Sequence, residues 1–169
     1  MSALAESTGA LNLGQGFPDE DGPAEVLEAA VAAVRAGHNQ YAPLPGVPAL
    51  RAAIAAHQRR FYGMEVDPEA GVQVTFGATE AIAAALLGLC EPGDKVVCFE
   101  PYYDSYAAGI AMAGAVRRPV TLRPPDWPVD PDALAAAIGA GRGRARVLLL
   151  NTPHNPCLLY TSPSPRDRS

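Results

Sequence analysis

The segment VQVTFGATEAI, residues 72–82, decides the fold that the sequence predicts. Its first five residues alternate apolar and polar side chains, which is the period of a β-strand. Gly77 permits a tight turn, and an Ala/Leu-rich helix is expected from there to about Cys90. The first turn of a helix has unpaired N–H groups and the positive end of the helix dipole, so it can bind a phosphate or a carboxylate. Taken alone, the segment also fits an ordinary strand-to-helix connection with Thr79 near the cap.

The residues after this segment alternate between strand and helix patterns. Strands are expected at 95–99, 116–122 and 145–150, and helices at 104–113 and 131–138, the second capped by Asp130. This alternation predicts an α/β fold with a mostly parallel sheet and helices on both faces.

The residues before the segment are helical or irregular in pattern. Helices are expected at 24–36 and 47–62, with Arg51 on the outward face of the second one. We therefore predict three regions: an N-terminal arm with helices at 1–66, a partial large domain at 67–156, and a non-native, disordered tail at 157–169.

Composition excludes several classes of partner. Apolar residues make up 49% of the 169 residues, but no run approaches the ~18 residues that a membrane span needs. With 13 basic and 18 acidic residues, the chain has no evident nucleic-acid face. The three cysteines lack metal or disulfide spacing, and no leader pattern is present, so we expect a cytoplasmic protein without a metal site.

Five motifs stand in a fixed order along the chain. They are LGQGFPD at 13–19, NQY at 39–41, GATE at 77–80, EPYY at 100–103 and NTPHNP at 151–156. With these motifs the chain resembles the class I/II aminotransferases of fold type I, which use pyridoxal phosphate. It most resembles the branch that holds N-succinyldiaminopimelate, kynurenine and methionine aminotransferases. The resemblance implies the three-layer αβα large domain of that fold.

The resemblance also implies where the cofactor binds. The amides of Gly77, Ala78 and Thr79 would hold the phosphate of pyridoxal 5′-phosphate at the start of the helix. Tyr103 would stack on the pyridine ring. Asn155 would donate a hydrogen bond to the phenolic oxygen of the ring.

Three further residues extend the implied site. Tyr41 matches the tyrosine that reaches the phosphate of a neighbouring subunit, which implies a homodimer with shared active sites. The backbone N–H of Gly16 would orient the substrate carboxylate, and Phe17 would line the substrate pocket.

The chain differs from the family because it lacks the lysine that transamination needs. Transamination needs a lysine that forms a Schiff base with the cofactor, and in this family that lysine lies well beyond the NTPHNP motif. Lys95 is the only lysine here, and its place at the start of a strand is opposite the ligand edge. We therefore expect an N-terminal fragment without a catalytic residue, inactive by itself.

Three alternatives to an aminotransferase of amino acid biosynthesis stay open. A carbon–sulfur β-lyase has the same fold and cofactor. A non-enzymatic regulator could carry an aminotransferase-like domain. A Rossmann nucleotide binder is disfavoured, because no Gly-x-Gly-x-x-Gly follows the first expected strand. The sequence does not define which amino acid and 2-oxo acid are the substrates.

Overall fold

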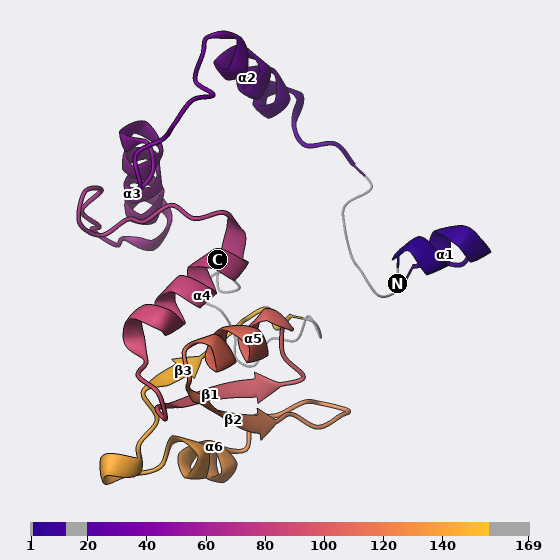
Figure 1. Cartoon of the computed structure of the whole chain (residues 1–169), viewed down its shortest axis with the longest axis vertical. Coiled ribbons are helices and arrows are strands. Elements are labelled where there is room, and N and C mark those ends of the chain that lie inside the picture. Colours follow the sequence, from indigo (N-terminus) through magenta and orange to yellow (C-terminus); the bar gives the residue numbers. More distant parts are fainter. Residues whose placement is uncertain (1, 13–19, 156–169) are drawn as a thin grey trace. The chain divides into compact units, whose positions relative to one another are not determined.

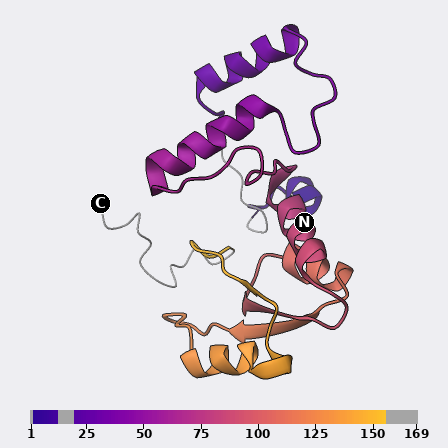
Figure 2. The same ribbon diagram turned by 90° about the vertical axis from the view of Figure 1, so that its left-hand side faces the viewer.

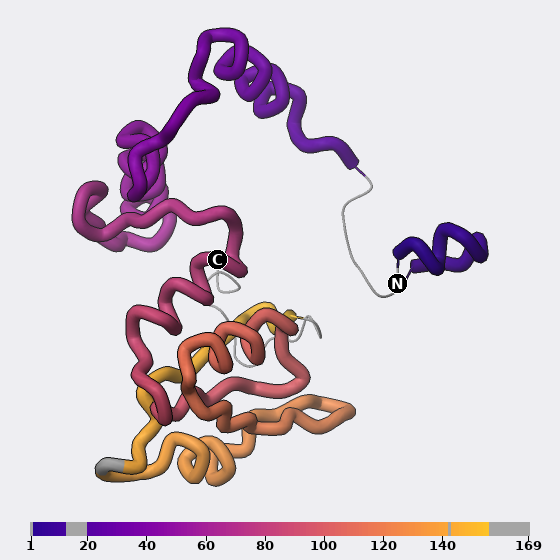
Figure 3. Tube along the Cα trace, viewed as in Figure 1, coloured from indigo at the N-terminus to yellow at the C-terminus, as the bar shows by residue number. Residues whose placement is uncertain are grey.

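The computed structural model describes residues 2–12 and 20–155, apart from the side chain of Arg142 (Figures 1 and 3). Contacts divide the chain into two compact units on either side of the Val47–Pro48 bond. Each unit is described separately below. The predicted boundary at residues 66/67 stays a prediction, and the tail predicted from residue 157 lies outside the described residues.

The first unit contains two helices, α1 (Ser2–Thr8) and α2 (Ala24–Arg35). The helix predicted at 24–36 is confirmed as α2, which begins directly after its N-cap residue, Pro23. The sequence did not predict α1, whose residues lack a helical period. Four apolar side chains of α2 are between 41% and 62% exposed: Val26, Leu27, Val31 and Val34.

The second unit contains the sheet. In chain order its elements are α3 (Pro48–Tyr62), α4 (Gly77–Leu89), β1 (Lys95–Glu100), α5 (Ser105–Met112), β2 (Val116–Thr121), α6 (Pro131–Ile138), a 3₁₀ turn (Gly141–Gly143) and β3 (Val147–Leu149). The strand order is β2-β1-β3, and β1 is parallel to both neighbours, with Val97 opposite Arg118 and Leu148. The predicted parallel sheet is therefore confirmed.

Helices cover both faces of this sheet, as Figures 1 and 2 show: α4 and α5 lie on one face and α6 on the other. The side chains of β1 alternate between two cores. Val96 packs with Leu86 of α4 and Ile110 of α5, whereas Val97 and Phe99 pack with β2 and α6. Because β1 is buried on both faces, its sequence is an apolar run and not an alternating one.

Two local features fix the helices on the sheet. The Asp130 carboxylate accepts hydrogen bonds from the Asp132 and Ala133 N–H groups, at 2.9 and 3.2 Å, and so caps α6 as predicted. Between α4 and α5, a Cβ on Gly109 would lie 3.0 Å from the Leu86 side chain. Glycine at this position therefore lets the two helices approach closely.

Two expectations about the second unit are wrong. Residues 72–76 form no strand in the described structure, because no described strand pairs with them. Arg51 does not point outward: its side chain is only 9% exposed, and the guanidinium donates a hydrogen bond to the Glu69 carbonyl. The loop after α3 supplies that carbonyl, whereas the buried Nε of Arg51 has no hydrogen-bond partner among the described residues.

No helix within residues 2–12 and 20–155 is long and apolar enough to cross a membrane.

Candidate active site

The start of α4 is a glycine turn that leaves backbone donors free. Gly77 has φ +77°, a conformation that favours glycine. Apart from its chain neighbours and its own helix backbone, no atom of the described residues lies within 4 Å of where its Cβ would be. The Gly77 N–H donates to the Thr75 carbonyl at 3.0 Å. The N–H groups of Ala78 and Thr79 have no helical acceptor, because their partners would precede the helix. Of the three amides predicted to bind phosphate, these two are therefore the available ones.

Glu80 holds this turn in place, a role that the sequence analysis missed. Its carboxylate accepts a hydrogen bond from the Phe76 N–H. The Thr75 hydroxyl also donates to the Gly77 carbonyl at 3.1 Å. The signal was present in the sequence, because a glutamate in the first turn commonly reaches back to a backbone N–H before the helix.

Thr79 and Tyr103 lie next to one another at the N-terminal end of α4, residues 77–79, which we call the mouth of α4. The Thr79 Oγ1 and the Tyr103 hydroxyl are 3.2 Å apart, although the residues belong to α4 and to the loop between β1 and α5. The structure thus places together two residues that the sequence assigned to the phosphate and to the ring of one ligand. Their roles toward a cofactor stay predictions.

Tyr103 belongs to a cluster of three tyrosines after β1. The Tyr103 ring meets Tyr106 edge-on, and the Tyr102 ring stacks on Tyr106. The Arg117 guanidinium of β2 lies 5.1 Å from the Tyr102 ring centroid, in a cation–π arrangement. Tyr102 is thereby held between β2 and α5.

Asn155 follows β3 at the same, carboxyl-terminal end of the parallel sheet. Its side chain is exposed, and no hydrogen bond to Thr79 or Tyr103 is found within the described residues. His154, beside it, is only 2% exposed. Asn151 opens this loop. Burial raises the pKa of the Tyr106 hydroxyl, and the Asn151 side chain opposes that shift.

The other predicted site residues belong to the first unit or lie outside the described residues. Tyr41 lies in the first unit, and its side chain is fully exposed at 100%. Gly16 and Phe17 lie outside the described residues. Lys95 is the first residue of β1, and its Nζ donates to the Gly143 carbonyl at 2.7 Å, which agrees with its predicted place away from the ligand edge.

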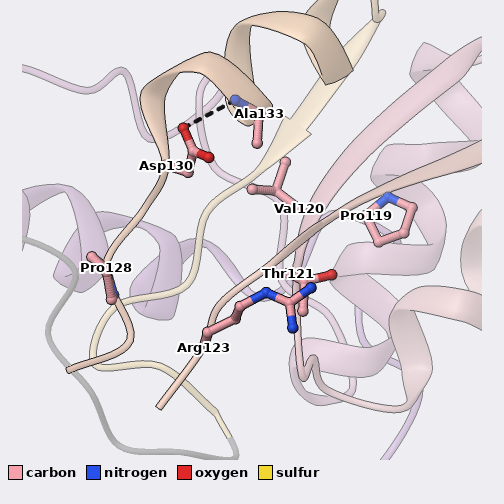
Figure 4. Close-up of a pocket in the computed structure, with 7 residues that line it drawn as sticks. All are labelled: Pro119, Val120, Thr121, Arg123, Pro128, Asp130 and Ala133. Atoms are coloured by element: carbon pink, nitrogen blue, oxygen red, sulfur yellow. Dashed lines mark hydrogen bonds between the residues drawn. The ribbon is translucent and has the colours of Figure 1, made fainter. Parts of the chain in front are cut away.

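A hollow of about 360 Å³ lies elsewhere, between β2 and the start of α6 (Figure 4). Thr121, Arg123 and Asp130 line it together with apolar neighbours, and none of the predicted site residues does. The Asp130 carboxylate already caps α6. Because none of the predicted site residues lines the hollow, it is separate from the candidate site. Among the residues that the structure describes, no cluster of side chains could hold a metal ion.

Burial of Cys98 in β1 predicts a loss of stability at alkaline pH. Desolvation raises the pKa of the Cys98 thiol to about 11. Between the ordinary thiol pKa and this value, the unfolded chain releases a proton that the folded chain keeps, so stability falls as pH rises from about 9 to 11. We expect the urea midpoint to fall over this range, and to fall less in Cys98→Ala. Equal slopes in both proteins would contradict the assignment.

A family model described as "Aminotransferase class I and II" matches residues 8–162. The chain belongs to the class I and II aminotransferase family, whose enzymes use pyridoxal phosphate. The fold-type I architecture predicted from the sequence is therefore confirmed.

Two solved structures and one further relative show how similar the chain is to known members. N-succinyldiaminopimelate aminotransferase from Mycobacterium tuberculosis is 56% identical, with a TM-score of 0.86 over 92% of this chain and 40% of that one. Escherichia coli YbdL, described with a methionine aminotransferase function, is 47% identical, with a TM-score of 0.87 over 94% of this chain and 41% of that one. Kynurenine–oxoglutarate transaminase 3 of Mus musculus is 35% identical over 92% of this chain and 36% of its own length. The chain thus spans about two fifths of the relatives it matches.

Proposed function

We propose that this chain is part of an aminotransferase that moves an amino group between an amino acid and a 2-oxo acid with pyridoxal phosphate. The observation that supports the proposal is that the first turn of α4 has backbone N–H donors without helical acceptors. There the Ala78 and Thr79 N–H groups are unpaired by the helix, and the Thr79 hydroxyl lies 3.2 Å from the hydroxyl of Tyr103. A phosphate and an aromatic ring fit these two neighbouring features.

The residues at this mouth fit the cofactor in both charge and space. Backbone N–H groups at the positive end of the α4 dipole favour a dianionic phosphate. Among the described residues, no side chain or distant backbone atom lies within 4 Å of the Gly77 Cβ position, which leaves room for the phosphate beside the backbone. Tyr103 would cover one face of the ring and exclude water from it, and Asn155 would donate to the phenolic oxygen. The cofactor supplies the electron sink through which the amino group is transferred.

The proposal includes a homodimer in which Tyr41 serves the neighbouring subunit. The fully exposed Tyr41 side chain and the exposed apolar side chains of α2 support a surface that another chain covers. Sedimentation of the full-length protein should give a dimer. A monomer with full activity would contradict this part of the proposal, and a cytoplasmic location is proposed with it.

An assay of the full-length protein tests the proposed activity. With 2-oxoglutarate as acceptor, we expect glutamate to form from at least one of N-succinyldiaminopimelate, methionine and kynurenine, because these are the substrates named for similar proteins. Release of pyruvate and ammonia from cystathionine, without glutamate, would instead indicate the carbon–sulfur β-lyase. Cofactor binding without either reaction would favour a regulator.

A further inference from the structure

The hydroxyl groups of Thr79 and Tyr103 form a side-chain hydrogen bond in the candidate site. Thr79 Oγ1 and the Tyr103 hydroxyl oxygen are 3.2 Å apart, although the two residues are 24 positions apart in the sequence. Either hydroxyl can be the donor, since each carries one hydrogen and can also accept. Stacking on a cofactor ring needs only the aromatic ring of Tyr103, so the proposed function leaves its hydroxyl without a role.

Two contacts define the position of the Tyr103 side chain. Its ring meets the Tyr106 ring edge-on, with centroids 5.9 Å apart and an interplanar angle of 80°. This edge-to-face geometry is favourable and limits rotation of the Tyr103 ring about its own axis. The Tyr106 ring belongs to α5 and is only 8% exposed, so it gives a rigid support. The bond to Thr79 holds the far end of the Tyr103 side chain, its hydroxyl, at the first turn of α4.

A bound phosphate would fix the direction of the Thr79–Tyr103 hydrogen bond. A phosphate dianion only accepts hydrogen bonds, whereas a threonine hydroxyl has one hydrogen to donate and lone pairs that accept. The Thr79 hydroxyl lies in the first turn of α4, together with the Ala78 and Thr79 N–H groups that are proposed to bind the phosphate. If the Thr79 hydroxyl donates its hydrogen to the phosphate, the hydrogen of the shared bond must come from Tyr103.

We propose that the Tyr103 hydroxyl donates to Thr79 Oγ1 and thereby orients the Thr79 hydroxyl toward the phosphate of the cofactor. This inference rests on the proposed function and gives Tyr103 a second role, in which it positions Thr79 and does not itself touch the phosphate. Without that donor the Thr79 hydroxyl rotates, since the hydrogen of a hydroxyl turns toward whichever acceptor is near. One connected pair of side chains thus serves both the ring and the phosphate of one ligand.

The test compares pyridoxine 5′-phosphate with pyridoxine, two ligands that differ only in the phosphate and lack the aldehyde that reacts with lysine. Tyr103→Phe in the full-length protein keeps the ring and removes its hydroxyl. We expect this variant to raise the dissociation constant for pyridoxine 5′-phosphate about three- to tenfold, as for the loss of one hydrogen bond. The dissociation constant for pyridoxine should change less than about twofold, because the ring that stacks is still present. Isothermal titration calorimetry measures both constants.

Tyr102→Phe is the matched control. The Tyr102 ring also contacts Tyr106, and none of the hydrogen bonds found among the described residues involves its hydroxyl. Both dissociation constants should therefore stay within about twofold of the wild type. Equal weakening of both ligands in Tyr103→Phe would show that the Tyr103 hydroxyl serves only the ring, and would overturn the proposal. Unchanged affinity for both ligands would overturn it too.

Variants of Thr79 test whether Tyr103 acts through this residue. Thr79→Val removes the hydroxyl and keeps the shape of the side chain, whereas Thr79→Ser keeps the hydroxyl. Combined with Thr79→Val, Tyr103→Phe should weaken the binding of pyridoxine 5′-phosphate less than about twofold further, and combined with Thr79→Ser it should have its full effect. Equal further losses in the two backgrounds would contradict an action through the Thr79 hydroxyl. Because the Thr79 side chain is exposed, we expect all these variants to fold.

The same ligands separate this proposal from the proposed function. If the wild-type protein binds neither pyridoxine 5′-phosphate nor pyridoxine, the proposed function and the role of the Tyr103 hydroxyl both fail. If the wild-type protein binds pyridoxine 5′-phosphate and Tyr103→Phe binds it equally well, only the role of the hydroxyl fails.

Discussion

Replacing Ala78 by proline is expected to weaken pyridoxal phosphate binding to the full-length protein about 10- to 100-fold, because one hydrogen bond to a charged group contributes roughly 1.5–3 kcal/mol. Proline removes the Ala78 N–H and nothing else from the mouth of α4. Proline suits the first turn of a helix, which is where position 78 lies. Titration of the absorbance of the cofactor measures the change.

The control for this substitution is Ala78→Gly, which keeps the N–H. We expect its affinity for pyridoxal phosphate to stay within about threefold of the wild type, since a glycine near a helix end costs little. The thermal midpoints of the proline and wild-type proteins should agree within a few degrees. Equal affinities in the proline and glycine variants would show that the Ala78 amide does not bind the phosphate.

Replacing Ile110 by alanine is expected to lower the free energy of unfolding by about 2–5 kcal/mol, the usual range for removing a large buried side chain. Ile110 is 1% exposed and packs with Leu86 and Val96, so its loss leaves a cavity between α5, α4 and β1. Urea denaturation followed by circular dichroism measures the effect.

Met112, two residues later on the same helix, provides the comparison. It is 67% exposed, and Met112→Ala should change the free energy of unfolding by less than about 0.5 kcal/mol. A loss of stability in Met112→Ala as large as that in Ile110→Ala would contradict the assignment of the core.

The elements that the sequence predicted correctly depend on local signals. The Asp130-Pro131 pair marks the start of α6 because both the cap and the first-turn proline act within a few residues. The apolar run of β1 indicates a strand covered on both faces, which is how α4, α5 and α6 enclose it.

The elements that the sequence mispredicted depend on distant partners. Residues 72–76 have the alternation of a strand, yet a strand needs a neighbour, and the described residues supply none. Arg51 is a charged residue of the kind that usually faces solvent, but its guanidinium is buried and donates a hydrogen bond to the Glu69 carbonyl, 18 residues away. Helical periodicity alone does not indicate such a bond.

In the candidate site, too, local features were predicted from the sequence, whereas contacts between distant residues were not. The GATE motif predicted the free amides at the mouth of α4, because a glycine turn before a helix is a local feature. The approach of the Thr79 and Tyr103 hydroxyls joins residues 24 positions apart. Only the packing of α5 against α4 and the sheet brings them together, and the motifs alone did not single out Tyr106.

A crystal structure of the full-length protein with pyridoxal phosphate tests the central claim most directly. The account predicts a phosphate oxygen within hydrogen-bonding distance of the Ala78 and Thr79 N–H groups, with the ring of Tyr103 over the pyridine. A phosphate bound by other residues, with the mouth of α4 open to solvent, would contradict it.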